Sequence, residues 1–160
     1  MPKIILCRGI QGSGKTTFAK QWVLEDPEHR VRFNNDDIRN MLGKYWVPSR
    51  EKLVLDLKKQ FIMSSMMAGY DIVIDNMNLN PKEVEFYKNY IEAHNRIMKE
   101  LDEETKVLKM MLSINKYELE FKDFFIPLQE CIERDSKRPN PIGEEVIKKT
   151  YEKYKYILEG

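Results

Sequence analysis

Short apolar runs alternate with longer amphipathic segments along the first half of this chain. The apolar runs at 3–8, 31–33 and 71–75 have the length and composition of buried strands. Between these runs, residues 16–24 and 49–67 place apolar side chains at helical spacing and charged side chains at the remaining positions. The alternation of strands with helices is that of an α/β protein.

The helix expected at 49–67 has a predicted buried face and a predicted solvated face. Its core-facing stripe is predicted to comprise Leu53, Leu57, Phe61, Ser64 and Ser65. The lysine and glutamate residues of this helix are expected on the solvated face. Met63, Met66 and Met67 are expected to fill the core, because a flexible thioether side chain adapts to irregular gaps.

The second half of the chain predicts further helices and one more strand. Asn80 and Pro81 begin an expected helix, whose apolar stripe runs to Leu101. A half-exposed edge strand is expected at 117–125, and two further helices are expected at 128–136 and 143–156. Apolar residues resume at helical spacing over 107–112, and residues 102–105 are expected to form a break or an exposed turn.

The composition is that of an ordinary globular protein, and it excludes several classes. The 160 residues are 42% hydrophobic and 33% charged, which suits one domain over residues 1–160 with a sizeable core. The net charge of +1 means that any nucleic-acid partner must meet a local basic patch. Cys7 and Cys131 are the two cysteines, which argues against a disulfide framework and favours a reducing cytoplasm. No apolar run approaches the length of a membrane span.

Residues 9–16, Gly-Ile-Gln-Gly-Ser-Gly-Lys-Thr, match the phosphate-loop pattern G-x-x-x-x-G-K-[ST] at every required position. A predicted strand precedes the match and a predicted helix follows it. Glycines let successive backbone N–H groups turn toward a polyphosphate, and the helix N-terminus adds partial positive charge. A glycine-rich turn beside a surface lysine is the alternative. The motif and its context predict nucleoside triphosphate binding.

The residues expected to hold the nucleotide lie in and directly after this loop. They are Gly12, Ser13, Gly14, Lys15, Thr16 and Thr17. Lys15 is expected to reach the β- and γ-phosphates, Thr16 to ligate Mg²⁺, and Thr17 to hydrogen-bond an inner phosphate. Because the loop begins at residue 9, the N-terminus is expected to be the native one.

Two further segments place acidic residues at the ends of predicted strands. After the second strand, Asp36 and Arg39 are three positions apart and share one face of a helix, while Asp37 points elsewhere. This segment caps a helix or forms an acceptor site, since ligands of open α/β sheets bind at the carboxyl edge. Asp75 ends the third strand, where it either orients a metal's water or an acceptor-site arginine, or satisfies a turn backbone.

The predicted helix at 128–136 and the segment that follows it are rich in charge. Arg134 and Arg138 are four positions apart, with Lys137 beside them. Such a helix is an ordinary charged surface helix, or it is the phosphate-clamping lid that a phosphate-loop kinase needs in this part of the chain. The lid is expected at about 128–142.

Four motifs in this order resemble the kinase domain of phage-type polynucleotide 5′-kinase/3′-phosphatases, within the P-loop kinase superfamily. They are GIQGSGKTT after a strand, NNDDIR, VIDNMNLNP, and ERDSKR before a C-terminal helix. The resemblance covers roughly residues 1–95 and 117–156. It implies a three-layer fold with a parallel sheet of about four strands flanked by helices. It also implies ATP at one end of the site, a 5′-hydroxyl at the other, and the cytoplasm of a bacterium or phage-infected host.

The resemblance also implies a role for each matching residue. Lys15 and Thr16 would serve ATP and Mg²⁺, and Asp36 would be the general base on the 5′-hydroxyl. Arg39 would grip the acceptor's 3′-phosphate, and Asp75 would line the acceptor site. Arg138 would stabilise the transferred phosphate, and Arg134 would be a second lid arginine near the nucleotide.

The chain departs from this family in two places. Residues 95–116 are longer than the family's loop and predict an extra helical insertion. No phosphatase domain follows, so the chain is expected to be a stand-alone kinase or an excised domain. A homo-oligomer and a separate phosphatase or ligase partner domain both remain open.

The resulting prediction is an ATP-dependent polynucleotide 5′-hydroxyl kinase that acts on DNA or RNA ends in nucleic-acid repair. The alternatives are a phosphate-loop kinase of a small molecule, a nucleotide or a modified DNA base, and a nucleotide-dependent binding module. The pairing of Asp36 with Arg39 argues against the binding module, because a switch needs no acceptor base.

Overall fold

The computed structural model describes residues 1–101, 103–111 and 114–160. Its centre is a four-stranded sheet in the order β2-β3-β1-β4, and every neighbouring pair of strands is parallel. The strands are β1 (Lys3–Arg8), β2 (Arg30–Phe33), β3 (Asp71–Ile74) and β4 (Glu118–Asp123). β4 lies at the edge of the sheet, as its alternating sequence predicted.

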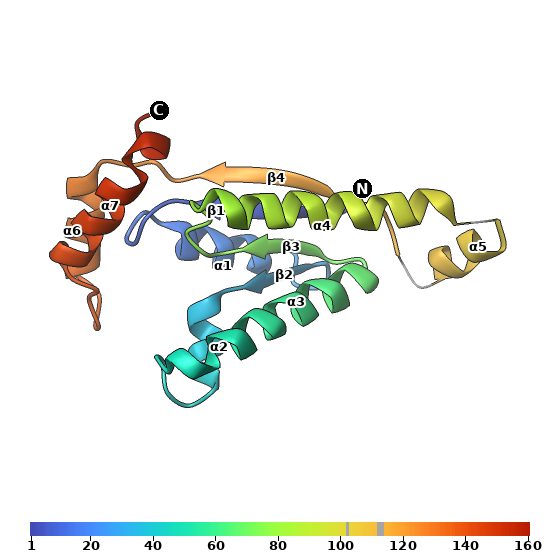
Figure 1. Ribbon diagram of the computed structural model, residues 1–160, viewed down its shortest axis with the longest axis horizontal. Coiled ribbons are helices and arrows are strands. Elements are labelled where there is room, and N and C mark those ends of the chain that lie inside the picture. Colours follow the sequence, from blue (N-terminus) through green and yellow to red (C-terminus); the bar gives the residue numbers. More distant parts are fainter. Residues whose placement is uncertain (102, 112–113) are drawn as a thin grey trace.

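Helices cover both faces of the sheet (Figure 1). Side chains alternate along each strand, so Ile5 and Val73 pack with α1 (Lys15–Glu25) on one face. On the other face, Leu6 and Ile74 pack with α3 (Glu51–Met67) and α4 (Pro81–Glu100). The expected three-layer α/β fold is therefore confirmed.

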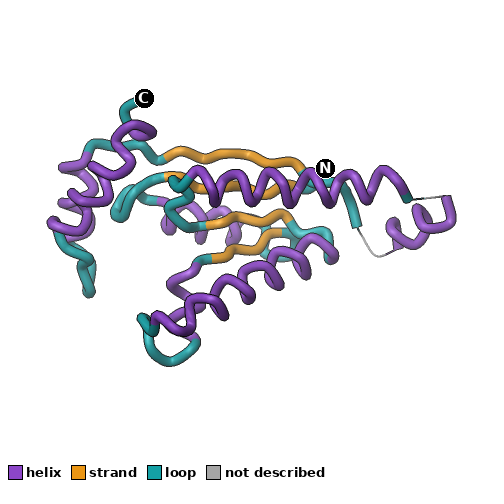
Figure 2. The backbone as a smooth tube through the Cα atoms, in the orientation of Figure 1, coloured by secondary structure: helices purple, strands orange, loops and turns teal. Residues whose placement is uncertain are grey.

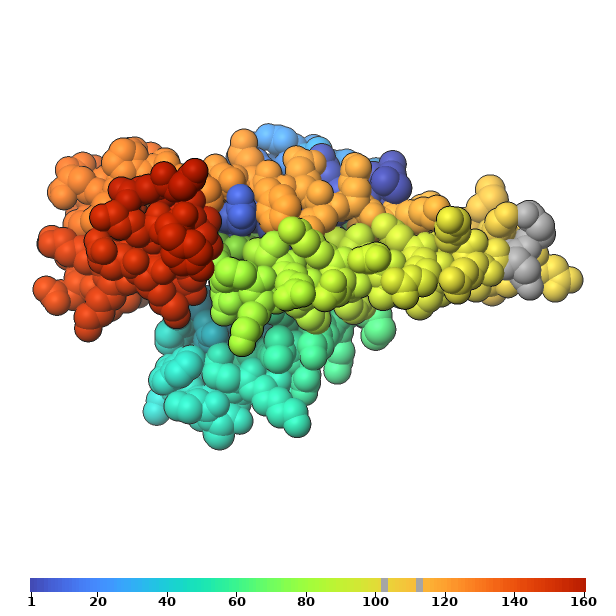
Figure 3. All heavy atoms as spheres, turned by 45° about the horizontal axis from the view of Figure 1, so that its top comes forward, coloured from blue at the N-terminus to red at the C-terminus, as the bar shows by residue number. Residues whose placement is uncertain are grey.

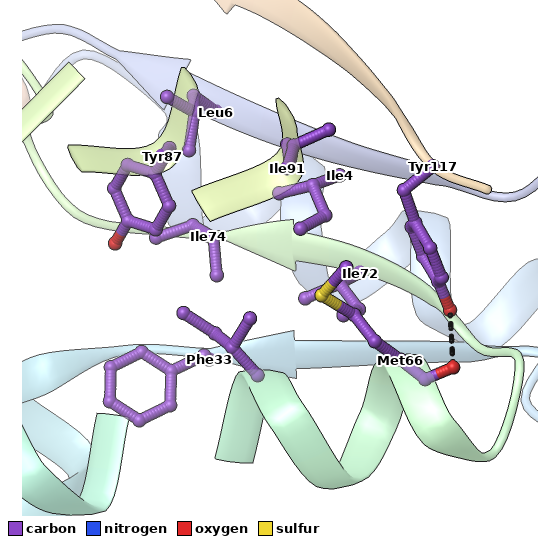
Figure 4. Packing of buried hydrophobic residues seen from close by; sticks show 10 residues of the cluster. Ile4, Leu6, Phe33, Met66, Ile72, Ile74, Tyr87, Ile91 and Tyr117 are labelled. Carbon is purple, nitrogen blue, oxygen red and sulfur yellow. Dashed lines mark hydrogen bonds between the residues drawn. The ribbon is translucent and has the colours of Figure 1, made fainter. Parts of the chain in front are cut away.

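The larger part of the core lies between the sheet and the pair α3–α4 (Figure 4). Its largest side chains are the aromatic rings of Phe33, Tyr87 and Tyr117, all almost completely buried. The Tyr117 hydroxyl donates a hydrogen bond of 2.6 Å to the carbonyl oxygen of Tyr70. That bond satisfies a polar group that burial would otherwise leave without a partner.

Several further helices gather at the carboxyl ends of the strands (Figure 2). They are α2 (Asn35–Met41), the short 3₁₀ helix η1 (Pro48–Arg50), α6 (Leu128–Ser136) and α7 (Glu144–Leu158). Ile10 and Leu79 pack with side chains of α6 and α7 in a separate apolar cluster. In the space-filling view, α6 and α7 form one end of the molecule (orange and red in Figure 3). The strand ends and the phosphate loop thus lie beside the predicted lid.

The prediction of which α3 residues face the core was partly wrong. Leu53 is 44% exposed, and Met63 and Met67 are also exposed. Lys58, expected on the solvated face, is only 5% exposed. The buried positions of the helix are Val54, Lys58, Ile62, Ser65 and Met66. The sequence carries two overlapping apolar stripes one position apart, and the packing of α3 against β2, β3 and α4 selects the second.

The segment at 95–116 is largely helical where the structure describes it. α4 continues to Glu100, and α5 (Glu103–Met111) follows. Asp102 and Leu112, which belong to the predicted break and the resumed stripe, lie outside the described residues. Val107 and Met111 are exposed, so these apolar residues of α5 do not extend the core.

Candidate functional site

The phosphate loop joins β1 to α1, and its glycines are required by conformation and by packing. Gly12 and Gly14 have φ angles of 77° and 99°, in the left-handed region that strains residues with a side chain. A β-carbon at position 12 would lie 2.4 Å from the carbonyl oxygen of Cys131 in α6. The loop can therefore pack against α6 only because position 12 is glycine.

Lys15 is buried inside the loop that it follows. Its ammonium donates hydrogen bonds to the carbonyl oxygen of Ile10 (2.8 Å) and to Oγ of Ser13 (3.4 Å). Burial lowers the pKa of Lys15 to about 8, although the nearby Asp75 carboxylate acts in the opposite direction. The lysine is thus a poorly solvated cation, which an incoming phosphate would stabilise.

Two cavities flank the loop, and Arg138 lines both. The first has a volume of about 770 Å³ and is lined by Gly12, Ser13, Gly14, Thr17, Phe18, Phe124, Ile126, Arg134 and Arg138. The second has a volume of about 520 Å³, and its lining includes the predicted residues Lys15, Thr16, Asp36, Arg39, Asp75 and Arg138. Each predicted site residue therefore lines at least one of these two cavities, and Arg138 lines both.

Asp36 and Arg39 form the expected pair on one face of α2. Nη1 of Arg39 donates to Oδ1 of Asp36 at 2.6 Å, and the Tyr45 hydroxyl donates to the same oxygen at 3.0 Å. Among the described residues, none donates a hydrogen bond to Oδ2 of Asp36. The helix is capped by Asn34, whose side chain accepts from the backbone N–H of Asp37. Asp36 itself is therefore not needed as a cap.

A carboxylate from another helix holds the guanidinium of Arg39. Its Nε and Nη2 donate to the two carboxylate oxygens of Glu51 at 3.0 and 2.8 Å. This bidentate pair raises the pKa of Arg39 and lowers that of Glu51. The bonds to Glu51 and Asp36 use three of the five N–H groups that an arginine carries, so two remain for a ligand.

Asp75 follows β3 and is 1% exposed. Its Oδ2 accepts from Nε of Arg32 at 2.9 Å and pairs with Nη2 at 2.7 Å. Its Oδ1 is buried and has no hydrogen-bond partner. A charged oxygen without a partner is costly to bury, and Asp75 lines the same cavity as Thr16. This oxygen is therefore available to a hydrogen-bond donor or to the water shell of a cation.

The lid segment is held by an aspartate at the end of α6. Asp135 is 2% exposed and accepts hydrogen bonds from the backbone N–H groups of Ile142 (3.1 Å) and Gly143 (2.9 Å). Burial acts to raise the pKa of Asp135, but these hydrogen bonds and Arg138 outweigh it and lower the pKa. Arg134 donates to the carbonyl oxygen of Ser13 at 3.3 Å and pairs with Glu130.

These residues fit a nucleotide with Mg²⁺. Gly12, Ser13 and Gly14 line the first cavity, and the Lys15 ammonium is hydrogen-bonded to the carbonyl oxygen of Ile10 within the loop. Thr16 supplies a hydroxyl oxygen, and Oδ1 of Asp75 supplies a carboxylate oxygen. Hydroxyl and carboxylate oxygens are the hard ligands that Mg²⁺ and its water shell prefer.

Comparison with protein families decides the membership of the chain. A family model described as an AAA domain matches residues 4–159. The chain belongs to this AAA domain family. Because the match begins in β1 and extends past α7, it covers the phosphate loop, both cavities and the lid of this AAA domain.

Two individual relatives match the chain at 22% and 31% identity. A protein assigned as a bifunctional polynucleotide kinase/RNA ligase in Autographa californica nuclear polyhedrosis virus is 22% identical over 95% of the AAA domain and 21% of the viral protein. Midasin of Dictyostelium discoideum is 31% identical over 59% of the AAA domain and 2% of midasin. The AAA domain therefore spans only a small part of either relative.

Solved structures show the same fold. A chain in the structure of the Pnkp1/Rnl/Hen1 RNA repair complex superposes with a TM-score of 0.73 and 22% identity, over 99% of the AAA domain and 45% of that chain. A second structure of a Pnkp1/Rnl/Hen1 complex gives a TM-score of 0.55 and 21% identity, over 83% of the AAA domain and 38% of that chain. The P-loop kinase fold and the resemblance to polynucleotide kinases are thus confirmed.

None of the described helices is long and apolar enough to cross a membrane.

Sequence reasoning missed several residues that position this site. Arg32 and Glu51 pair with Asp75 and Arg39 over separations of 43 and 12 residues, which no local pattern reveals. Asn78 has a φ of 49° and donates from its buried amide to the carbonyl oxygens of Cys7 (2.8 Å) and Ile74 (3.0 Å). It thereby joins the ends of β1 and β3 in this AAA domain. The one signal for this role in the sequence was an asparagine in the polar segment after a strand, because asparagine adopts the left-handed conformation more readily than most residues.

Proposed function

We propose that this chain transfers the γ-phosphate of ATP to the 5′-hydroxyl of a polynucleotide end. The observation that carries the proposal is the state of Asp36. One of its oxygens is held by Arg39 and Tyr45, and the other faces no donor among the described residues. The same cavity is lined by Lys15 and Thr16. A carboxylate held at one oxygen, opposite a phosphate-binding lysine, is the arrangement that a general base requires.

The reaction assigned to this site balances as a phosphoryl transfer. The 5′-oxygen forms a bond to the γ-phosphorus, the bond from that phosphorus to the bridging β–γ oxygen breaks, and ADP leaves. Oδ2 of Asp36 takes the proton of the 5′-hydroxyl. Such a transfer needs positioned charge more than covalent catalysis, so one base and several cations suffice.

The remaining residues supply charge and orientation. Lys15 would neutralise the β- and γ-phosphates, and Gly12, Ser13, Gly14 and Thr17 would bind the phosphate chain. Thr16 and Asp75, which line the same cavity, would hold Mg²⁺ and its water shell, and the ion would supply charge neutralisation at the phosphates when bound. Arg138 borders both cavities and is assigned to the transferred phosphate, and Arg134 to the nucleotide. The two free N–H groups of Arg39 are assigned to the acceptor's 3′-phosphate.

The proposal also assigns segments of the chain to parts of a kinase domain. Residues 1–160 are assigned to a single kinase domain, with residues 128–142 as its lid and residues 95–116 as a helical insertion. The relatives named above are longer than this chain, and one of them is named as a kinase joined to an RNA ligase. A ligase or phosphatase activity in a partner domain is therefore consistent with the proposal, as is a homo-oligomer.

One labelling experiment tests the activity. The protein is incubated with γ-labelled ATP, Mg²⁺ and separate acceptors: 5′-hydroxyl oligonucleotides of RNA and DNA, nucleoside 3′- and 5′-monophosphates, and amino sugars. Label on the 5′-hydroxyl acceptors supports the proposal. Label on the small molecules alone would assign the site to a small-molecule kinase. Free phosphate without any labelled acceptor would favour a nucleotide-dependent binding module.

Asp36→Asn tests the assigned base, because an amide keeps the size of the side chain but accepts no proton. We expect kcat to fall by a factor of about 100 or more, the range of general-base catalysis, while ATP affinity changes less than about twofold. Steady-state kinetics and ATP titration measure the two quantities. Asp37→Asn, on the adjacent residue that pairs with Arg32, is the matched control. A collapse of ATP binding in Asp36→Asn would make Asp36 a structural residue.

A further inference from the structure

Lys58 is a buried cation at the interface of α3 and α4. The whole residue is 5% exposed, and burial lowers its pKa. Its ammonium lies 5.5 Å from the ring centre of Phe86 and 5.4 Å from that of Tyr87, both in α4. Ring faces attract a cation, but they replace only part of the lost hydration.

Lys58 has no anionic partner close enough for an ion pair among the described residues. Glu83 is the one acidic group that stabilises its charged form, and it does so through space and without a hydrogen bond. The ammonium is not among the polar atoms that are wholly enclosed without a partner, so it retains access to a ligand. A buried ammonium with three unused donors is costly unless a ligand satisfies it.

The Tyr87 hydroxyl is a second unused donor in the same interface. Tyr87 is 1% exposed, and its hydroxyl has no hydrogen-bond partner. Figure 4 shows this hydroxyl at the outer end of the ring, away from Ile4 and Ile91. Because this hydroxyl is wholly enclosed, the Lys58 ammonium is the one of these two donors that an anion can reach.

The α3–α4 interface adjoins the cavity assigned to the acceptor. Glu83 lines that cavity one helical turn before Tyr87, and Glu51 holds Arg39 at the start of α3. Lys58 is seven residues beyond Glu51, a distance of roughly 10 Å along a helix. At a rise of about 3.4 Å per nucleotide, a single nucleotide held by Arg39 does not reach Lys58, but a strand of about three nucleotides does.

Aromatic and basic side chains continue along this interface. Phe86 and Tyr90 are half-buried, with ring centres 5.9 Å apart, and the ammonium of Lys59 lies 5.9 Å from the Phe86 ring. Half-exposed rings beside lysines are the combination that binds single-stranded nucleic acid, because bases stack on the rings and phosphates pair with the cations.

We propose that Lys58 binds a backbone phosphate of the acceptor strand beyond its terminal nucleotide. The site therefore selects an oligonucleotide over a single nucleotide. This inference rests on the proposed function for the location of the 5′-end. Its phosphate contact, however, is a binding property that can be measured without phosphoryl transfer.

The variant Lys58→Met removes the charge and keeps most of the side-chain volume. Fluorescence anisotropy, in the absence of ATP, compares a single-stranded 5′-hydroxyl hexanucleotide with a nucleoside 3′-monophosphate as competitor. We expect hexanucleotide binding to weaken roughly tenfold, the value of one charge-assisted contact. The slope of log K against log salt should fall by about 0.7, because one phosphate contact is lost from a single strand. Monophosphate binding should change less than about twofold.

Lys88→Met is the matched control. Lys88 is also in α4 and lies 5.8 Å from an aromatic ring, but that ring is Phe121 of β4, outside the α3–α4 interface. This variant should alter neither ligand. If Lys58→Met does not fold, Lys58→Gln keeps a polar end without the charge, and it must weaken hexanucleotide binding alone.

The outcomes separate this inference from the proposed function. An equal loss of both ligands, an unchanged salt slope or no loss at all would overturn the phosphate contact and leave Lys58 a structural residue. Selective loss of hexanucleotide binding supports the contact even if no label transfers from ATP, in which case the proposed function alone fails. Label transfer by Lys58→Met to both acceptors with the same kinetics as the wild-type protein would retain the kinase and overturn the selection for length.

Discussion

Replacement of Lys15 by methionine should stabilise the ligand-free protein near neutral pH while it removes triphosphate binding. Burial lowers the pKa of Lys15 from 10.5 to about 8, which corresponds to a cost of roughly 3 kcal/mol for keeping the charged form in the folded state. Loss of the hydrogen bond to the carbonyl oxygen of Ile10 offsets about 1 kcal/mol. We therefore expect a net stabilisation of about 2 kcal/mol at pH 7.

The stability of the wild-type protein should also depend on pH in a way that the variant lacks. The pKa of Lys15 is depressed in the folded protein, so between pH 8 and 10.5 the unfolded chain binds the proton more tightly. The free energy of unfolding of the wild type should therefore rise with pH in this range. Below pH 8 both states hold the proton, and this contribution is constant. The stability advantage of Lys15→Met should thus shrink as the pH rises above 8.

Urea unfolding followed by circular dichroism, at intervals from pH 7 to 10, measures this difference. Subtracting one protein from the other cancels the groups that both proteins share, among them the Cys7 thiol. Lys20→Met removes an exposed lysine from the same helix and serves as the control. A difference between wild type and Lys15→Met that stays constant from pH 7 to 10 would refute the idea that the phosphate loop holds a destabilised cation.

Two further predictions concern the positions that shape the site. Gly12→Ala should destabilise the protein by about 2 kcal/mol or more and weaken ATP binding, because a β-carbon meets the Cys131 carbonyl at 2.4 Å. Gly43 has a similar φ of 98°, but a β-carbon there would meet no atom within 4 Å, so Gly43→Ala is the control for backbone strain alone. Urea unfolding measures the stability of both variants. An equal loss of stability in the two would contradict the clash with the Cys131 carbonyl. Glu51→Gln should cost about 1–2 kcal/mol of stability and lower kcat with little change in ATP affinity, because Arg39 loses its charged bidentate partner. Unfolding and kinetics test this, and an unchanged kcat would show that Glu51 does not position Arg39.

The features that local sequence dictates were predictable. A phosphate loop needs only a strand, a run with glycines at set positions and a helix start, and all three lie within residues 3–25. Asn34 and Asn80 cap helices through contacts with residues two or three positions away. The pairing of Asp36 with Arg39 depends on helical spacing alone. In each case the interacting groups are neighbours in the chain, so the sequence contains the geometry.

Only the tertiary structure decided which distant groups meet. The phase of α3 depended on which of two overlapping stripes faces the sheet, and that choice buried Lys58 against Tyr87. The pairing of Arg39 with Glu51, and of Asp75 with Arg32, requires segments that fold onto one another. Gly12 is needed because α6 returns to the phosphate loop across more than a hundred residues. Burial and pairing across such separations set the charge state and orientation of each group, and no local periodicity encodes them.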